Sequence, residues 1–268
     1  MKKILLYILL STFSELAFGQ IDSVYKDGHI IAADKKLNVV TKAEGDSAYM
    51  RNEYGKAIQI YETLLKRGEA AEIYYNLGNS YYKSEEIARA ILNYERALLL
   101  QPGSADDIQA NLEIARAKTI DKVELVPEIF FVTWTKALIN SMSMDAWAIL
   151  GIVSFVLFVT ALVLFIFSKQ IVWKKIGFIS GVVCLIIVIS SNLFAWQLKK
   201  RLVNRTDAII ITPSVTVRST PSENGTSLFI LHEGRKVNIK DNSMKGWKEI
   251  RLEDGKVGWV SSTAVEEI

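Results

Sequence analysis

The only imidazole and thiol side chains of this chain are His29, His232 and Cys184. A zinc site needs several Cys or His ligands at short spacings, and no such spacing is present. A thiol nucleophile needs a histidine beside it, but Cys184 lies inside a long apolar run. The chain also lacks a GxxxxGK[ST] loop for a nucleotide. We therefore expect no metal, no cofactor and no catalysis by this chain, and a single cysteine excludes an internal disulfide.

A repeated pattern in the first half predicts a binding protein instead. Gly45, Ala57 and Tyr61 recur 33 residues later as Gly78, Ala90 and Tyr94 in a second copy. A period near 34, with small residues early and an aromatic residue later, is the tetratricopeptide pattern of paired helices. The second copy matches this pattern at Tyr74, Leu77, Gly78, Tyr81, Ala90, Tyr94, Ala97 and Pro102. The expected repeats are 38–70 and 71–104, followed by a capping helix that ends near 120.

The concave surface of this helical solenoid is the expected site of protein binding. In tetratricopeptide folds the first helix of each repeat lines that surface. Residues spaced to point the same way along these helices are Lys42, Asp46, Tyr49, Tyr75, Asn79, Tyr82 and Lys83. Acidic residues expected on the same face (Asp46, Asp106 and Glu113) argue against a clamp for C-terminal carboxylates.

Three apolar segments indicate a membrane protein. Lysines followed by an apolar run and Ala17-Phe18-Gly19 predict a signal peptide over 1–19, and Glu15 leaves an uncleaved anchor as the alternative. Two longer segments predict transmembrane helices over 146–168 and 176–198, joined by a cytoplasmic link, 169–175. A linker, 199–206, follows the second span, and residues 20–37 resolve into no repeat.

The basic residues lie at the edges of the predicted spans. Residues 146–206 hold seven Lys or Arg and no Asp or Glu, whereas 20–145 hold 15 basic and 19 acidic residues. The positive net charge of the chain therefore indicates lipid headgroups rather than nucleic acid. The basic residues of the link and those after the second span do not decide the orientation, but the signal peptide does. Two spans then put both soluble parts on the extracytoplasmic side.

An aromatic-rich helix is expected within 121–145, ahead of the first span. It contains Ile129-Phe130-Phe131 and Trp134. Two interpretations stay open at this point: the helix lies in the membrane interface, or it packs on the capping helix.

The last 62 residues, 207–268, alternate as six short strands separated by turn residues, which predicts a small β-barrel. The strings Val215–Ser222, Leu231–Gly234, Gly246-Trp247 and Gly255–Val260 resemble the bacterial SH3 family. Trp247 and Trp259 are its candidate ligand face, although barrel core and rim positions are the commoner use of such residues.

The order of parts resembles the BatE family of the Bacteroides-type aerotolerance operon. The densest parts of the resemblance are Tyr74–Asn79, Ala90–Leu98 and Asn111–Arg116. The resemblance implies an envelope complex with membrane-anchored von Willebrand A-domain Bat proteins and, indirectly, a cytoplasmic MoxR-type ATPase. It does not imply a biochemical activity.

The expected fold class is thus a multidomain membrane protein with an all-α tetratricopeptide solenoid, two transmembrane helices and a C-terminal all-β SH3-like barrel. We expect a non-enzymatic adaptor of the bacterial cytoplasmic membrane, with both soluble domains periplasmic. The alternative is a peptidoglycan-binding or envelope-sensing protein that the SH3 module holds to the wall.

Overall fold

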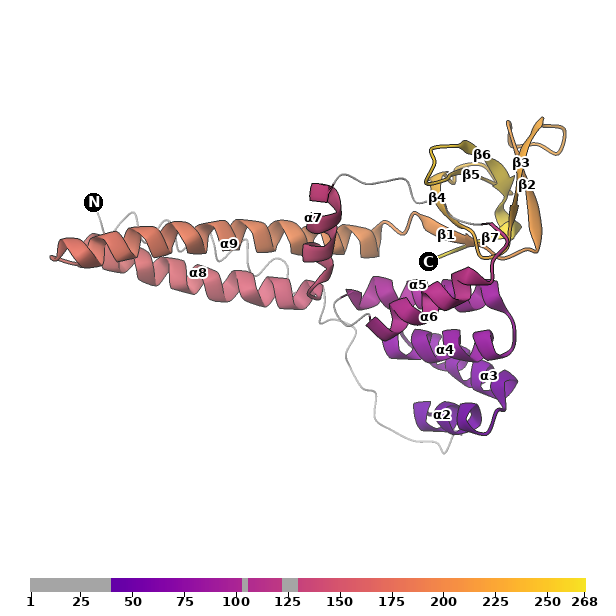
Figure 1. Cartoon of the computed structure of the whole chain (residues 1–268), viewed down its shortest axis with the longest axis horizontal. Coiled ribbons are helices and arrows are strands. Elements are labelled where there is room, and N and C mark those ends of the chain that lie inside the picture. The colour runs from indigo at the N-terminus through magenta and orange to yellow at the C-terminus, as the bar shows by residue number, and fades with distance from the viewer. Residues whose placement is uncertain (1–39, 103–105, 122–129) are drawn as a thin grey trace. The chain divides into compact units, whose positions relative to one another are not determined.

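The computed structural model describes residues 40–102, 106–121 and 130–268 of the chain. The expected signal peptide (1–19), the unassigned segment 20–37 and His29 lie outside these residues. Figure 1 shows a helical region, a pair of long helices and a region of strands.

Five helices form the helical region: α2 (Lys42–Met50), α3 (Tyr54–Leu65), α4 (Ala71–Lys83), α5 (Ile87–Leu100) and α6 (Asp106–Ala117). Thr41 begins α2 with a capping box, in which its hydroxyl accepts from the Glu44 backbone N–H and Glu44 accepts from the Thr41 N–H. The turn inside each helix pair contains one non-glycine residue at positive φ, Asn52 at 62° and Glu85 at 65°. These two residues are 33 positions apart, so the repeat extends to the backbone of its turns.

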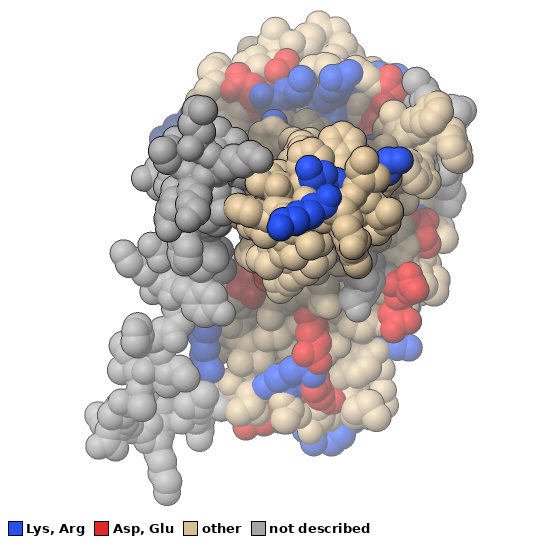
Figure 2. All heavy atoms as spheres, turned by 90° about the vertical axis from the view of Figure 1, so that its left-hand side faces the viewer, with Lys and Arg blue, Asp and Glu red and all other residues tan. Residues whose placement is uncertain are grey.

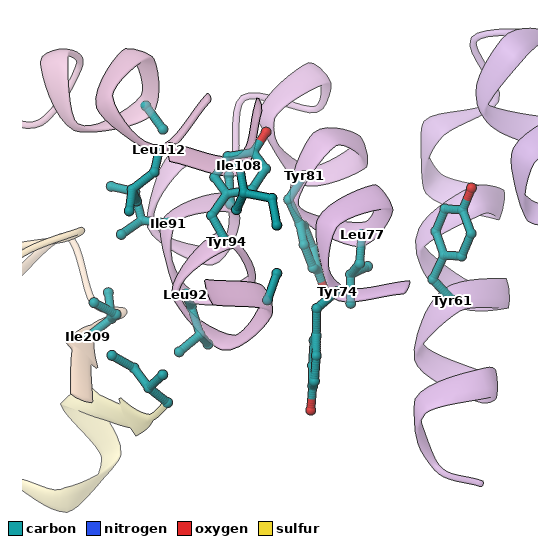
Figure 3. Packing of buried hydrophobic residues seen from close by; sticks show 14 of the residues in the cluster. Tyr61, Tyr74, Leu77, Tyr81, Ile91, Leu92, Tyr94, Ile108, Leu112 and Ile209 are labelled. Carbon is teal, nitrogen blue, oxygen red and sulfur yellow. The ribbon is translucent and has the colours of Figure 1, made fainter. Parts of the chain in front are cut away.

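Close packing within each pair depends on a glycine against a tyrosine ring. A Cβ on Gly45 would lie 2.6 Å from Tyr61 Cε1, and one on Gly78 would lie 2.7 Å from Tyr94 Cδ1. Both tyrosines are buried, with 1% of their surface exposed. They belong to one apolar cluster that continues through Leu77 to the α6 residues, part of which Figure 3 shows. Helix α6 buries Ile108, Leu112 and Ala115, as expected of a capping helix.

Helices α8 (Met144–Phe167) and α9 (Ile171–Val203) are long and apolar enough, by length and composition, to cross a membrane. They form a close antiparallel pair. A Cβ on Gly177 would lie 2.8 Å from the Ala161 carbonyl oxygen, and one on Gly151 would lie 2.9 Å from Ser191 Oγ. Small residues at the contact allow the backbones to approach, which is how helices associate in lipid.

The boundaries of these two helices differ from those we expected. Residues 171–175, expected as part of the link, form the start of α9, and residues 199–203, expected as linker, form its end. Lys and Arg residues at both ends of α9 interrupt the apolar run. They are good helix formers, so the helix extends beyond the hydrophobic stretch. Figure 2 views the turn of this pair end-on and shows Lys and Arg side chains within an otherwise uncharged surface.

The C-terminal region is a seven-stranded antiparallel sheet in the order β3-β2-β6-β5-β4-β1-β7. The strands are β1 (Asp207–Ile210), β2 (Ser214–Arg218), β3 (Ser227–His232), β4 (Lys236–Asp241), β5 (Trp247–Arg251), β6 (Val257–Ser261) and β7 (Val265–Glu267). The sheet curls around a core that includes Val217, Ile250 and Val260 (Figure 1). The sequence predicted six of these strands. It missed β7, which has three residues and pairs with β1.

The sheet also contacts α5, which the sequence did not predict. Ile209 of β1 and the C-terminal residue Ile268 belong to the apolar cluster of the helical region (Figure 3). Lys236 Nζ lies 2.8 Å from Glu95 Oε2, and Arg96 Nη2 donates to the Glu267 carbonyl oxygen at 2.6 Å. Glu95, which is buried, also pairs with Arg116.

Candidate protein-binding groove

The seven residues expected on the concave surface line two adjoining cavities of the helical region. One cavity, about 330 Å³, is lined by Tyr49, Tyr75, Asn79, Tyr82, Lys83, Tyr94, Asn111 and Ile114. The other, about 300 Å³, is lined by Lys42, Asp46, Tyr49, Met50, Tyr61, Glu72, Asn76 and Asn79. Tyr49 and Asn79 line both, so the two cavities adjoin, and we refer to them together as the groove. Binding by these residues stays a prediction.

A hydrogen-bonded unit at the floor of the groove occurs once in each repeat. In the first, Asp46 Oδ1 accepts from the Tyr61 hydroxyl at 2.7 Å and from Asn76 Nδ2 at 3.1 Å. In the second, Asn79 Oδ1 accepts from the Tyr94 hydroxyl at 2.8 Å and from Asn111 Nδ2 at 3.0 Å. Each unit ties the concave helix to the second helix of its own pair and to the helix that follows. The side chains of the groove floor are therefore held in place before any ligand arrives.

These bonds orient the amide of Asn79. Its oxygen is engaged by two donors, and the residue lines both cavities. Within the described part of the chain, Nδ2 of Asn79 makes no hydrogen bond. Each primary amide offers two N–H donors, which suit the backbone carbonyls of an extended peptide. The Asn79 amide, between the rings of Tyr49, Tyr75 and Tyr82, is thus a fixed donor in an aromatic setting.

The charges of the groove differ between its two ends. At the α2 end, Lys42 Nζ lies 2.8 Å from Asp46 and 2.7 Å from Glu72, so the charges there are compensated. The hydrogen bond to Asp46 raises the pKa of Lys42 above its ordinary value. Burial acts to raise the pKa of Asp46, but hydrogen bonds from Lys42 and Tyr61 outweigh it and lower that pKa.

The α6 end is cationic. Lys118 Nζ lies 4.2 Å from the centre of the Tyr82 ring, a cation–π distance. Lys83 is exposed on the neighbouring turn and, among the residues that the structure describes, has no ion pair. An acidic side chain of a ligand would find an uncompensated positive charge here.

Sequence reasoning missed seven lining residues: Met50, Tyr61, Glu72, Asn76, Tyr94, Asn111 and Ile114. Met50 is 79% exposed and Ile114 is 53% exposed, so apolar side chains stand open at both ends of the groove. The sequence indicated α6 only as a solvating cap. Asn111 has the same role as Asn76, because each donates to the concave-face residue of the preceding helix pair. It lies 35 residues after Asn76, so the exact 33-residue offset did not indicate it.

The acidic residues expected beside the groove are placed differently. Asp46 lines it, but Asp106 and Glu113 do not. Glu113 is instead paired with Arg116 on α6 at 3.0 Å. Asn111 and Ile114 occupy the inner face of α6, so Glu113 lies on its outer face. The argument against a carboxylate clamp therefore rests on Asp46 and Glu72 alone.

The candidate residues for metal or nucleophilic chemistry do not come together. Cys184 lies in the middle of α9, and His232 Nδ1 lies 2.8 Å from Asp121 Oδ1. In the described ranges, no group of three or more His, Cys, Asp or Glu side chains could hold a metal ion.

Trp247 and Trp259 lie on the outer face of the sheet. Trp247 is opposite Ser261 and Trp259 is opposite Glu249, and residues opposite each other across a strand pair share a face. The intervening Ile250 and Val260 point into the core. Both tryptophans are half-buried and neither belongs to the core cluster, so they are not core residues, and the ligand face and the rim stay as the two interpretations.

Comparison with protein families supports both modules. Residues 71–104 match the tetratricopeptide repeat family, and residues 213–266 match the bacterial SH3 domain family. A comparison with curated proteins gives no match. The chain therefore contains a tetratricopeptide repeat and a bacterial SH3 domain, together with two helices that could span a membrane.

Proposed function

We propose that this protein is a non-enzymatic adaptor that is anchored in the bacterial cytoplasmic membrane and binds an extended segment of a partner protein. The observation that carries the proposal is the groove with a preformed, unengaged amide donor at Asn79. Tetratricopeptide and bacterial SH3 modules are both binding modules, and neither supplies reactive groups. Helices α8 and α9 act as the anchor.

The groove favours one kind of ligand. Backbone carbonyls of an extended peptide would accept from the Asn79 amide, and its apolar side chains would contact the tyrosines that line the groove. An acidic residue would lie near Lys83 and Lys118. The α2 end, where acids and a lysine already compensate one another, would receive an uncharged part of the segment.

The partners that we propose follow from the resemblance to the BatE family. They are membrane-anchored von Willebrand A-domain Bat proteins and, through them, a MoxR-type ATPase. The location is the periplasmic side of the cytoplasmic membrane for both soluble modules, because an even number of spans returns the chain to the side it left. Proteins anchored in the same membrane would meet the groove at high local concentration.

A co-purification experiment tests this proposal. The double variant Tyr75→Ala, Lys83→Ala removes one ring and one charge from the groove and should abolish recovery of membrane partners. A matched control, Gln59→Ala with Lys66→Ala, removes two side chains of the α3 region that do not line the groove. Unchanged partner recovery in the groove variant, at equal expression, would refute the adaptor proposal.

The second candidate is binding to the cell wall through the SH3 module. The observation in its favour is the pair of tryptophans on the outer face of β5 and β6, since accessible aromatic rings are a common way to bind sugars and peptides. Under this proposal a chain that ends at Arg205 loses sedimentation with purified sacculi but keeps its protein partners. Failure of residues 207–268 to sediment with sacculi would count against wall binding.

A further inference from the structure

Helix α7 (Phe130–Asn140) has apolar side chains that nothing in the described protein covers. Phe130 and Phe131 are each 73% exposed, and Trp134 is 59% exposed. Every residue from Phe131 to Leu138 is exposed, which is unusual for a segment this rich in aromatic residues. The expectation that α7 packs on the capping helix would have required these side chains to be buried, so that alternative is wrong.

The aromatic side chains of α7 and Leu138 gather on one side of the helix. At about 100° per residue, Phe130, Phe131, Trp134 and Leu138 fall within an arc of roughly 100°. Lys136 falls opposite this arc and Thr133 lies beside it, and we call the side of these two residues the polar side, although Val132 also lies outside the arc. This is the pattern of a helix that lies flat at a boundary between apolar and aqueous surroundings.

The C-terminal end of α7 is fastened to the long helices near the end of the apolar run of α9. Ile139 is buried with Trp147 and Leu198, and the indole N–H of Trp147 donates to the Ile139 carbonyl oxygen at 3.0 Å. Arg201 Nη1 donates to Asn140 Oδ1, also at 3.0 Å. This attachment lies where the apolar residues of α9 give way to Lys199, Lys200 and Arg201. Figure 1 shows α7 running across the α8–α9 pair rather than along it.

From this arrangement we propose that α7 is a third membrane contact, which lies in the headgroup region of the bilayer with its arc of Phe130, Phe131, Trp134 and Leu138 in the acyl boundary. The proposal rests on α8 and α9 spanning the bilayer. The occupant follows from three points: the C-terminal end of α7 adjoins the end of the apolar pair, basic residues that suit lipid phosphates follow in α9 at the same end, and tryptophan prefers this zone. A helix held across the spans would keep the soluble modules at a fixed height above the membrane.

Nitroxide accessibility in the full chain tests this proposal. In a Cys184→Ser background, single cysteines at Phe131 and Trp134 probe the apolar arc, and cysteines at Thr133 and Lys136 probe the polar side. The labelled protein is reconstituted into phosphatidylcholine–phosphatidylglycerol liposomes. Collision with oxygen, which concentrates in lipid, is compared with collision with a water-soluble nickel chelate. We expect the oxygen-to-nickel ratio to be higher at both arc positions than at both polar positions.

Two results would overturn the proposal. High nickel accessibility at all four positions would place α7 in water, and low accessibility to both reagents at the arc would mean that protein covers it. A nitroxide at Leu157, which is 54% exposed on α8, separates this failure from failure of the anchor. If Leu157 is in lipid and the arc is not, the inference about α7 fails alone. If Leu157 is also accessible to nickel, the membrane anchor itself is wrong.

Discussion

Replacement of Gly78 by alanine should separate α4 from α5 and weaken the second repeat. The new Cβ would lie 2.7 Å from both Cδ1 and Cε1 of Tyr94 and 3.3 Å from the Ala90 carbonyl oxygen. Ordinary contacts of a Cβ begin near 3.4 Å. The tyrosine ring cannot swing away, because it is buried and its hydroxyl is bonded to Asn79. The two helices must therefore move apart by several tenths of an ångström.

The expected cost is about 1–3 kcal/mol, the usual range for added volume in a packed core. A glycine-to-alanine change inside an unhindered helix has the opposite sign, with a gain of up to about 1 kcal/mol. Gly55 lies near the start of α3, and a Cβ added there would have no neighbour within 4 Å. Gly55→Ala is thus a matched control with the same chemical change and no contact.

Hydrogen–deuterium exchange of the full chain in lipid nanodiscs measures this effect. In α5, amides of Gly78→Ala should exchange roughly 5- to 150-fold faster than those of the wild type, which corresponds to 1–3 kcal/mol. Those of Gly55→Ala should exchange at the wild-type rate or more slowly. Wild-type or greater protection of α5 in Gly78→Ala would refute the argument that this glycine sets the distance between the helices.

Three further predictions concern the turn, the contact between modules and the topology. Glu85→Gly should stabilise the second repeat by about 0.5–1 kcal/mol, because glycine adopts positive φ without steric cost. Amides of α4 and α5 should then exchange more slowly, and faster exchange would contradict this prediction. Glu95→Ala removes the buried partner that Arg116 and Lys236 share, and these cations then keep only the more exposed Glu113 and Asp207. This change should loosen the sheet from α5 by about 1–3 kcal/mol, seen as faster exchange in β1 and β4; unchanged protection there would show that the Glu95 ion pairs contribute nothing. In a Cys184→Ser background, an impermeant thiol reagent is added to spheroplasts that carry a single cysteine at Glu85, Ser243 or Lys174. The reagent should label the cysteines at Glu85 and Ser243 and spare the one at Lys174. Labelling at Lys174 alone would invert the proposed topology.

Repetition made much of the helical region predictable. The offset of 33 residues located both helix pairs, and the pattern positions Gly78 and Tyr94 proved to pack against each other. The same periodicity placed Tyr75 and Asn79 on one face of α4, where they line the groove. Alternation and turn residues likewise located six of the seven strands.

The remaining features depend on contacts between segments that are distant in the sequence. The buried Glu95 carries no local sign of its two partners, one of which is 141 residues away in β4. The groove residues Asn111 and Ile114 belong to a helix whose inner face is defined by its packing on α4 and α5. Boundaries of α9 were missed because hydropathy marks the apolar run and not the helix, which continues through Lys175 and Lys199.

Site-specific photo-crosslinking in living cells tests the central claim, that the groove binds a segment of another membrane-associated protein. A photoreactive phenylalanine derivative at Tyr82 places the probe in the groove, and one at Gln59 places it on a part of α3 outside the groove. We predict a discrete adduct with a membrane-associated protein from Tyr82, weakened by Lys83→Glu, and none of that adduct from Gln59. Adducts of equal strength from both positions, or an adduct from Tyr82 that is insensitive to Lys83→Glu and to loss of the Tyr75 ring, would contradict binding in the groove.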